Sequence, residues 1–274
     1  HMGTRTWNAA TIIVLALGCS DDSEPDETTG DEGTEVVSIQ PRGESATDPL
    51  IAALGGSANL AALTGLRIEG TGTRYLPNEG VRPSDAPIEA NTFERTVSID
   101  ISADAFRVDT SRDIQFLFPA SEMFSSIVRG NLGASTQPFF GTPLGALGSD
   151  KVASIRRQEL LLTPHLVLRE LDLSALVADG EEMFDGQPHR RFVTDEGPAP
   201  LTLFVNAETG VLSKLETLEH DFYSRDVTLE VLFSDWAPAG NLSFPRRLSV
   251  VRDGQTLFTE TVSDVTVNPS FEAT

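Results

Sequence analysis

The feature that most constrains the fold is a two-residue alternation of apolar and polar side chains, which begins at Leu66 and recurs along the rest of the sequence. Leu66 and Ile68 alternate with polar residues, and Gly70 and Gly72 take the next two places on the apolar side. A period of two is typical of β-strands with one buried face. Glycines on that face indicate tight curvature or the close approach of another backbone.

Further strands are predicted where the alternation recurs, at 96–101, 106–109, 114–118, 191–194, 201–205, 211–218, 227–233, 247–252 and 257–267. Residues 206–210 and 253–254 have the composition of turns between antiparallel strands. Helices are predicted at 48–54, at 57–65 and within 149–173, where the period lengthens. This order predicts an α+β fold with about ten strands, in which a strongly curved antiparallel sheet, or incomplete barrel, is covered by a few helices.

The amino terminus has the pattern of an export signal. Met2 is the expected start, and His1 before it is attributed to a cloning junction. An uncharged apolar run of nine residues, 9–17, leads directly to Gly18 and Cys19. A helical membrane span needs about 20 residues, so 2–18 is predicted to be a signal peptide. The small residue before the cysteine resembles a bacterial lipobox, which implies lipid attachment at Cys19; the alternative is a signal peptide with an incidental cysteine.

The segment that follows is acidic and has little to bury. Residues 19–48 are predicted to be a lipidated cysteine followed by a disordered tether, and 49–274 to be one domain. The spacing of the tether's aspartates does not match a calcium-binding loop. The chain carries 41 acidic and 20 Lys or Arg residues, a formal net charge of −21. Such a field repels polyanions, so nucleic acid is excluded as a partner.

The residues that most often carry catalysis or bind metals do not form a motif here. His165, His189 and His220 lie far apart in the sequence, and none has the spacing of a metal ligand pair. We expect each to be solvated or at the edge of the core. Glu181 and Glu182 are neighbours, which on a strand point to opposite faces, so they are expected in a turn or solvated patch. We predict no metal, no cofactor and no enzymatic activity.

Aromatic residues gather in one stretch of the chain. Five of the fifteen phenylalanines lie between residues 114 and 140: Phe116, Phe118, Phe124, Phe139 and Phe140. One interpretation is that they belong to the core. The functional interpretation is that they line a groove for an apolar ligand, with Leu162 and Leu166 on its helical side.

Together these elements resemble the LolA/LolB-like superfamily of bacterial lipoprotein carriers. The most specific pieces are the N-A-E-T-G sequence at 206–210, S-D-W at 234–236 and F-P-R at 244–246. The resemblance implies an incomplete barrel that holds an acyl chain beneath a helical lid. The last two pieces are also similar to the amino-terminal domain that precedes secreted metallo-β-lactamase-fold hydrolases. Those enzymes need an H-x-H-x-D-H cluster, which the 274 residues lack.

The sequence therefore predicts a lipid-anchored protein of the bacterial envelope, at the outer membrane and facing the periplasm or the surface. Its partner would be a hydrophobic small molecule or lipid, bound without catalysis. The alternatives are an accessory domain of a metallo-hydrolase whose catalytic part is absent from these residues, or a structural lipoprotein whose interior is filled by side chains.

A first prediction concerns the leader. Expressed in a bacterium with its own leader, the mature protein should begin at Cys19, carry acyl chains and partition into detergent, as mass spectrometry and phase separation would show. Cys19→Ala should release the protein or stall the precursor. A water-soluble, unacylated wild-type protein would show that the lipoprotein interpretation is wrong.

Overall fold

The computed structural model describes residues 46–77, 86–116, 119–137, 142–195, 200–221 and 225–271. The predicted signal peptide, Cys19 and nearly all of the predicted tether lie outside these residues, as do Phe118, Phe139 and Phe140. None of the helices found in the described ranges is long and apolar enough to cross a membrane.

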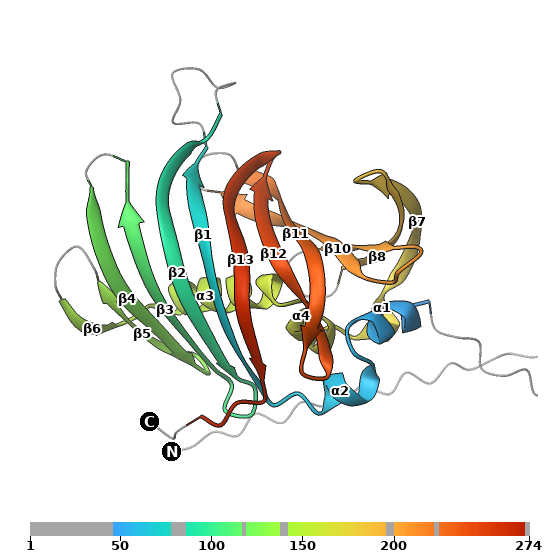
Figure 1. Cartoon of the computed structure of the whole chain (residues 1–274), viewed down its shortest axis with the longest axis horizontal. Helices are drawn as coiled ribbons and strands as arrows, with labels where there is room; N and C mark the ends of the chain where they lie inside the picture. Colours follow the sequence, from blue (N-terminus) through green and yellow to red (C-terminus); the bar gives the residue numbers. More distant parts are fainter. Residues whose placement is uncertain are drawn as a thin grey trace, which may run out of the picture. The chain divides into compact units, whose positions relative to one another are not determined.

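All strands of the described chain belong to one antiparallel sheet of thirteen strands. In chain order they are β1 (Gly65–Leu76), β2 (Ile88–Asp100), β3 (Ala105–Ile114), β4 (Ala120–Arg129), β5 (Leu132–Gln137), β6 (Thr142–Ala146), β7 (Val177–Phe184), β8 (Gln187–Thr194), β9 (Leu201–Asn206), β10 (Leu212–Asp221), β11 (Arg225–Ala239), β12 (Leu242–Arg252) and β13 (Gln255–Val267). The sheet is strongly bent, and its edge strands β6 and β7 are not paired with each other. The predicted curved, open antiparallel sheet with a few helices is therefore confirmed (Figure 1).

The connectivity of the sheet decides where the helices lie. β1 to β6 run outward to one edge, β7 to β13 run inward from the other edge, and β13 pairs with β1 in the middle. The chain must cross from edge to edge between β6 and β7. That crossing contains α3 (Ser149–Leu162) and α4 (Pro164–Glu170), and Figure 1 shows α3 lying across the sheet. Two short helices, α1 (Asp48–Ala53) and α2 (Ser57–Ala61), precede β1.

The core lies between these helices and the inner face of the sheet. Leu50 and Leu54, at either end of α1, are fully buried. The residues of α4 from Pro164 to Leu168 are all buried as well. Strand residues from both halves of the sheet complete the same cluster, among them Ile68, Val97, Leu203, Leu215, Val231, Phe244 and Val262. Apolar burial of this extent is the main source of stability for the fold.

The N-A-E-T-G turn is a hairpin between β9 and β10, as predicted, and it also docks the first helix. The side-chain Oδ1 of Asn206 accepts hydrogen bonds from the backbone N–H groups of Glu208 (3.0 Å) and Thr209 (2.9 Å). Gly210 has a φ of 73°, a conformation that favours glycine. A Cβ there would lie 2.6 Å from the carbonyl oxygen of Pro49 at the start of α1. The turn therefore needs glycine for both its backbone and its contact.

The S-D-W and F-P-R pieces face each other across β11 and β12. Ser234 pairs with Arg247 and Trp236 with Pro245 in one unbroken register, and Asp235 between them has a φ of 55°. The Asp235 carboxylate forms an ion pair with Arg247 at 2.9 Å. The positive φ of Asp235 interrupts the regular extended backbone of β11 at this point.

Several predictions of elements need correction. Sequence analysis did not identify β4, β5, β6 or β7, and the strand predicted over 114–118 is wrong because β3 ends at Ile114. Seven of the eight residues of β7 are exposed, so this edge strand carries no apolar alternation. Glu181 and Glu182 lie on it and form ion pairs with Arg190 (3.9 Å) and Arg191 (3.4 Å).

The expected positions of two histidines are also wrong. His165 and His189 are 0% and 2% exposed rather than solvated or at the edge of the core. His189 is satisfied there, because its ring nitrogens contact the Gln187 carbonyl oxygen (2.9 Å) and the Ser213 hydroxyl (2.8 Å). The surroundings of the His220 side chain lie outside the described structure.

His165 is buried against an aromatic ring without a good polar partner. Its imidazole stacks on Phe244, with ring centroids 5.1 Å apart, and neither ring nitrogen has a hydrogen bond of good geometry. Burial lowers the pKa of His165 from 6.5 to about 4, and the nearby backbone of Ser243 and Leu54 offsets only part of that effect. The folded protein therefore holds His165 neutral over a range in which the unfolded chain takes up a proton.

This difference predicts acid sensitivity. As the pH falls from 6.5 to about 4, the unfolded state binds the proton more readily, so the free energy of unfolding should decrease. The His165 contribution should be at most about 3 kcal/mol. Urea unfolding across this range should show a flatter pH profile for His165→Leu than for the wild type. Identical profiles would contradict the assignment.

Candidate functional site

Two cavities lie between α3 and the inner face of the sheet. The first, here called the polar cavity, has a volume of about 640 Å³ and lies mainly over β1 to β5. The second, here called the apolar cavity, has a volume of about 920 Å³ and lies mainly over β9 to β13. Arg74, Gln158 and Phe258 line both cavities, so the two spaces adjoin.

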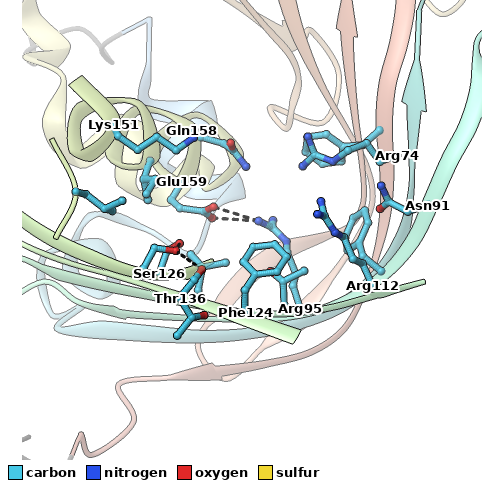
Figure 2. Close-up of a pocket in the computed structure, with 17 residues that line it drawn as sticks. Arg74, Asn91, Arg95, Arg112, Phe124, Ser126, Thr136, Lys151, Gln158 and Glu159 are labelled. Atoms are coloured by element: carbon cyan, nitrogen blue, oxygen red, sulfur yellow. Dashed lines mark hydrogen bonds and ion pairs between the residues drawn. The ribbon is translucent and has the colours of Figure 1, made fainter. Parts of the chain in front are cut away.

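Three polar side chains project into the polar cavity from three adjacent strands (Figure 2). Arg74 of β1 pairs with Asn91 of β2, and Arg112 of β3 pairs with Phe93, two residues farther along β2. Strand alternation places these residues on the inner face. The Arg74 guanidinium lies 5.6 Å from the centroid of the Phe258 ring. Arg112 lies 5.2 Å from the Phe124 ring and donates to Glu122 at 2.7 Å.

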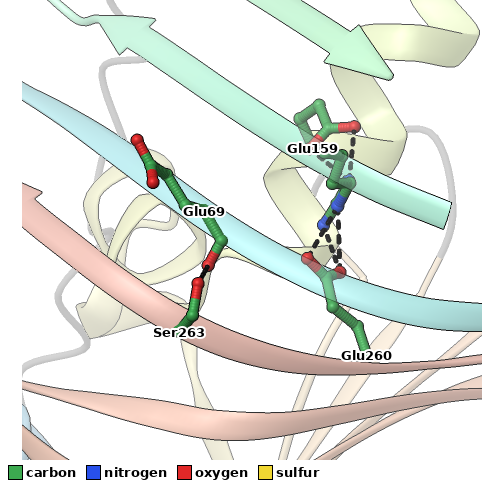
Figure 3. Close-up of polar contacts among 5 residues, drawn as sticks. Glu69, Glu159, Glu260 and Ser263 are labelled. Atoms are coloured by element: carbon green, nitrogen blue, oxygen red, sulfur yellow. Dashed lines mark hydrogen bonds and ion pairs between the residues drawn. The ribbon is translucent and has the colours of Figure 1, made fainter. Parts of the chain in front are cut away.

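A buried ion triad ties α3 to the sheet beside this cavity. Arg95 Nε of β2 donates to both oxygens of Glu260 on β13 at 2.9 Å, and Arg95 Nη1 donates to the Glu159 carboxylate of α3 at 3.2 Å. The side chains of Arg95, Glu159 and Glu260 are 8%, 3% and 0% exposed. Figure 3 shows the polar contacts of the two glutamates. One guanidinium thus joins three elements that are distant in sequence.

Two glycines make room for this arrangement. A Cβ on Gly70 would lie 2.5 Å from Oε1 of Glu260, and a Cβ on Gly72 would overlap the Phe93 ring and the Thr259 carbonyl oxygen. The register between β1 and β13 shifts at Gly70, which leaves Ser263 unpaired, and the Ser263 hydroxyl donates to the Glu69 carbonyl oxygen at 3.1 Å (Figure 3). The close approach predicted from these glycines is confirmed.

The charges inside the site shift one another's pKa values. Burial disfavours the Arg95 charge, but Glu159 and Glu260 outweigh it and hold the pKa of Arg95 above its ordinary value. Burial raises the pKa of the Glu159 carboxyl, and the attraction of Arg95 offsets only part of that rise. The pKa of Arg74 is lowered, first because the cavity walls displace part of the water around its guanidinium and then because Arg112 and Arg95 repel its charge. Part of the Arg74 side chain still faces the open space of the cavity.

The apolar cavity is walled on two sides by branched aliphatic side chains. They come from the helical segment and from the inner face of β9 to β13: Leu160, Leu161, Leu162, Leu171, Leu201, Leu218, Leu229, Val231, Val250 and Leu257. Arg157, which also lines this cavity, links α3 to β10: its Nη2 donates to the Thr217 hydroxyl (3.2 Å) and to the Leu218 carbonyl oxygen (3.1 Å). The aliphatic walls can enclose a hydrocarbon, and the rest of the lining is largely polar: Arg74, Asp150, Ser154, Arg157, Gln158, Glu170 and Glu219.

The structure separates the ligand-binding residues predicted from the sequence. Phe124 lines the polar cavity and Leu162 the apolar cavity. Phe116 and Leu166 are not among the lining residues of either cavity; Leu166 is 4% exposed, within the core. The other three phenylalanines lie outside the described residues. Sequence reasoning missed Arg74, Arg95, Arg112, Glu159 and Glu260, although each arginine stands on the apolar side of an alternating strand.

Comparisons with known proteins give a similarity of architecture. No protein-family model matches the chain, and no curated protein matches its sequence. Two solved structures are similar: a DUF1329 family protein from Desulfovibrio piger (13% identity, TM-score 0.49) and a LolA superfamily protein from Nitrosomonas europaea (9% identity, TM-score 0.46). Each alignment covers 82% of this chain and 93% of the other.

Across the described residues, no group of three or more His, Cys, Asp or Glu side chains is arranged to hold a metal ion. His165 and His189 contact different partners, Phe244 and Ser213 respectively, so the core does not bring them together as ligands.

The triad generates a prediction about stability. Arg95→Met should lower the free energy of unfolding by about 3–5 kcal/mol, because it leaves two buried carboxylates without their counter-charge. Arg67→Met is the matched control, since Arg67 pairs with Glu69 on the exposed face of the sheet, where its side chain is 51% exposed. That change should cost less than about 1 kcal/mol. Equal urea midpoints for the two variants would refute the role assigned to the triad.

Proposed function

We propose that this protein is a lipid-anchored component of the bacterial envelope that binds a hydrophobic ligand, a lipid or an acyl chain, without catalysis. The observation that carries the proposal is the apolar cavity. Its volume of about 920 Å³ falls in the range of about 300–1,000 Å³ that is typical of small-molecule sites. Its walls are mostly leucine and valine, which suits a hydrocarbon.

Several of these walls are apolar yet only partly buried. Leu160, Leu171, Leu201 and Leu257 are half-buried, and Leu218 is 45% exposed, although all five line the interior of the cavity. Apolar surface that faces an internal space gains stability when a ligand removes it from water. Each buried CH₂ group contributes about 0.8 kcal/mol, so a long chain can exceed the several kcal/mol that association costs.

The envelope location and the anchor rest on the sequence. The apolar run 9–17 and the cysteine that follows it support an exported, acylated protein with Cys19 as the attachment point, directed to the outer membrane. A lipid anchor would hold the cavity close to a source of apolar ligand. The absence of enzymatic activity and of nucleic-acid partners belongs to the same proposal.

The binding prediction uses an uncharged fluorescent probe. N-phenyl-1-naphthylamine should bind the wild-type protein with a dissociation constant in the micromolar range, which corresponds to about 8 kcal/mol. Replacing two partly exposed wall residues together, Leu218→Gln with Leu257→Gln, should weaken binding about tenfold, because apolar contact area is lost. Fluorescence titration measures both values.

The control is a second pair of exposed leucines away from both cavities. Leu132 and Leu144 are 78% and 54% exposed, and changing both to glutamine should leave probe affinity within about twofold of the wild type. Unfolding midpoints recorded for each variant separate lost binding from lost folding. If the wild-type protein fails to bind the probe, the apolar cavity is not a ligand site.

A further inference from the structure

Arg74 occupies the place where the two cavities meet. It lines both of them, and its guanidinium rests over Phe258, which also lines both. Among the described residues, Arg74 makes no hydrogen bond and no ion pair. Glu159 attracts Arg74 from a distance, but no carboxylate of the described residues is bound to its guanidinium, which leaves the donors of Arg74 available to an anion.

The polar cavity is cationic within a strongly acidic chain. Four basic side chains line it: Arg74, Arg95, Arg112 and Lys151. Arg95 is paired with Glu159 and Glu260, and Arg112 with Glu122, so three carboxylates stand against four cations. The chain as a whole has a formal net charge of −21. Asn91 adds an amide beside Arg74 and is 6% exposed (Figure 2). The lining therefore departs in sign from the rest of the protein.

We infer that the ligand is a single-chain amphiphile with an anionic headgroup, held by Arg74, Asn91 and Arg112 while its hydrocarbon chain fills the apolar cavity. This inference rests on the proposed function and adds the class of ligand to it. Carboxylate and phosphate headgroups share the required chemistry, because both accept hydrogen bonds from a guanidinium and an amide.

The electrostatics of the site agree with this geometry. The cavity walls, together with Arg112 and Arg95, lower the pKa of Arg74. An anion bound beside Arg74 would supply the opposite charge that favours its protonated form. A bound anionic headgroup would thus also offset the repulsion of Arg74 by Arg112 and Arg95.

The test compares three ligands that each have twelve carbon atoms. Because burial of the hydrocarbon contributes about equally to all three, differences in affinity report on the headgroup. Laurate, dodecyl phosphate and dodecanol displace N-phenyl-1-naphthylamine from the protein, and displacement gives each affinity. At least one anion should bind about tenfold or more tightly than the alcohol, since a charge-assisted hydrogen bond contributes on this scale. Which anion binds more tightly identifies the headgroup.

Variants assign the preference to a residue. Arg74→Gln should reduce the preference for anion over alcohol to less than about threefold, and Arg74→Lys should retain most of it. Arg67→Gln is the matched control on the same strand, because Arg67 lies on the opposite face and is exposed, and it should keep the full preference. Circular dichroism and unfolding midpoints confirm that each variant is folded.

Three results would separate a failure of this inference from a failure of the proposed function. If dodecanol and both anions bind the wild type equally, the anionic headgroup is refuted while the cavity remains a hydrophobic site. If the anions are preferred but Arg74→Gln keeps that preference, the assignment of the headgroup to Arg74 is wrong. If no ligand binds and the probe does not bind either, the proposed function falls together with the inference.

Discussion

The position of α3 depends on one guanidinium group. Arg95 takes a carboxylate from the helix on one side and a carboxylate from β13 on the other, and all three side chains are buried. The apolar contacts of α3 lie toward its ends, at Val152 and at Leu161 and Leu162, with Glu159 between them. A buried ion triad stabilises a fold little compared with apolar packing of the same volume, but it demands a particular geometry. The triad therefore sets how far the helix stands from the sheet, and the two cavities occupy the space that remains.

The strand order makes a covering helix unavoidable. Because β13 pairs with β1 in the middle of the sheet, the two halves of the chain end at opposite edges, and the link between them must cross a face. A connection carrying apolar side chains crosses the face where apolar side chains already lie. Local features allow the curvature that gives this face its depth, among them the register shift at Gly70 and the glycines that admit Glu260 and Phe93.

Sequence patterns predicted the central strands and the helices because those elements bury one face and leave the other in water. They failed at β4 to β7, near the edges of the sheet, where few side chains are buried. Val128 of β4 is buried, but Met123 on the same strand is 81% exposed, and seven of the eight residues of β7 are exposed. The site was harder still. Arg74, Arg95 and Arg112 occupy positions at which the alternation of their strands places apolar residues. Only the register of β1, β2 and β3 shows that they lie near one another. Glu159 precedes a run of leucines in α3, and Glu260, the other carboxylate bound by Arg95, lies about a hundred residues later, so no local spacing connects them.

The charges of the protein act differently on an anionic ligand at long range and inside the cavity. On the outer face of β1 and β3, arginines pair with acids two residues away, as Arg67 does with Glu69 and Arg107 with Asp109, so these cations are compensated where they stand. The net charge of −21 then gives a negative field that repels anions from a distance. An anionic ligand gains nothing from steering and must be held by contacts made inside the cavity. Apolar burial of its chain supplies the affinity, and the inner-face arginines, screened from bulk solvent by the cavity walls, supply the preference for the headgroup.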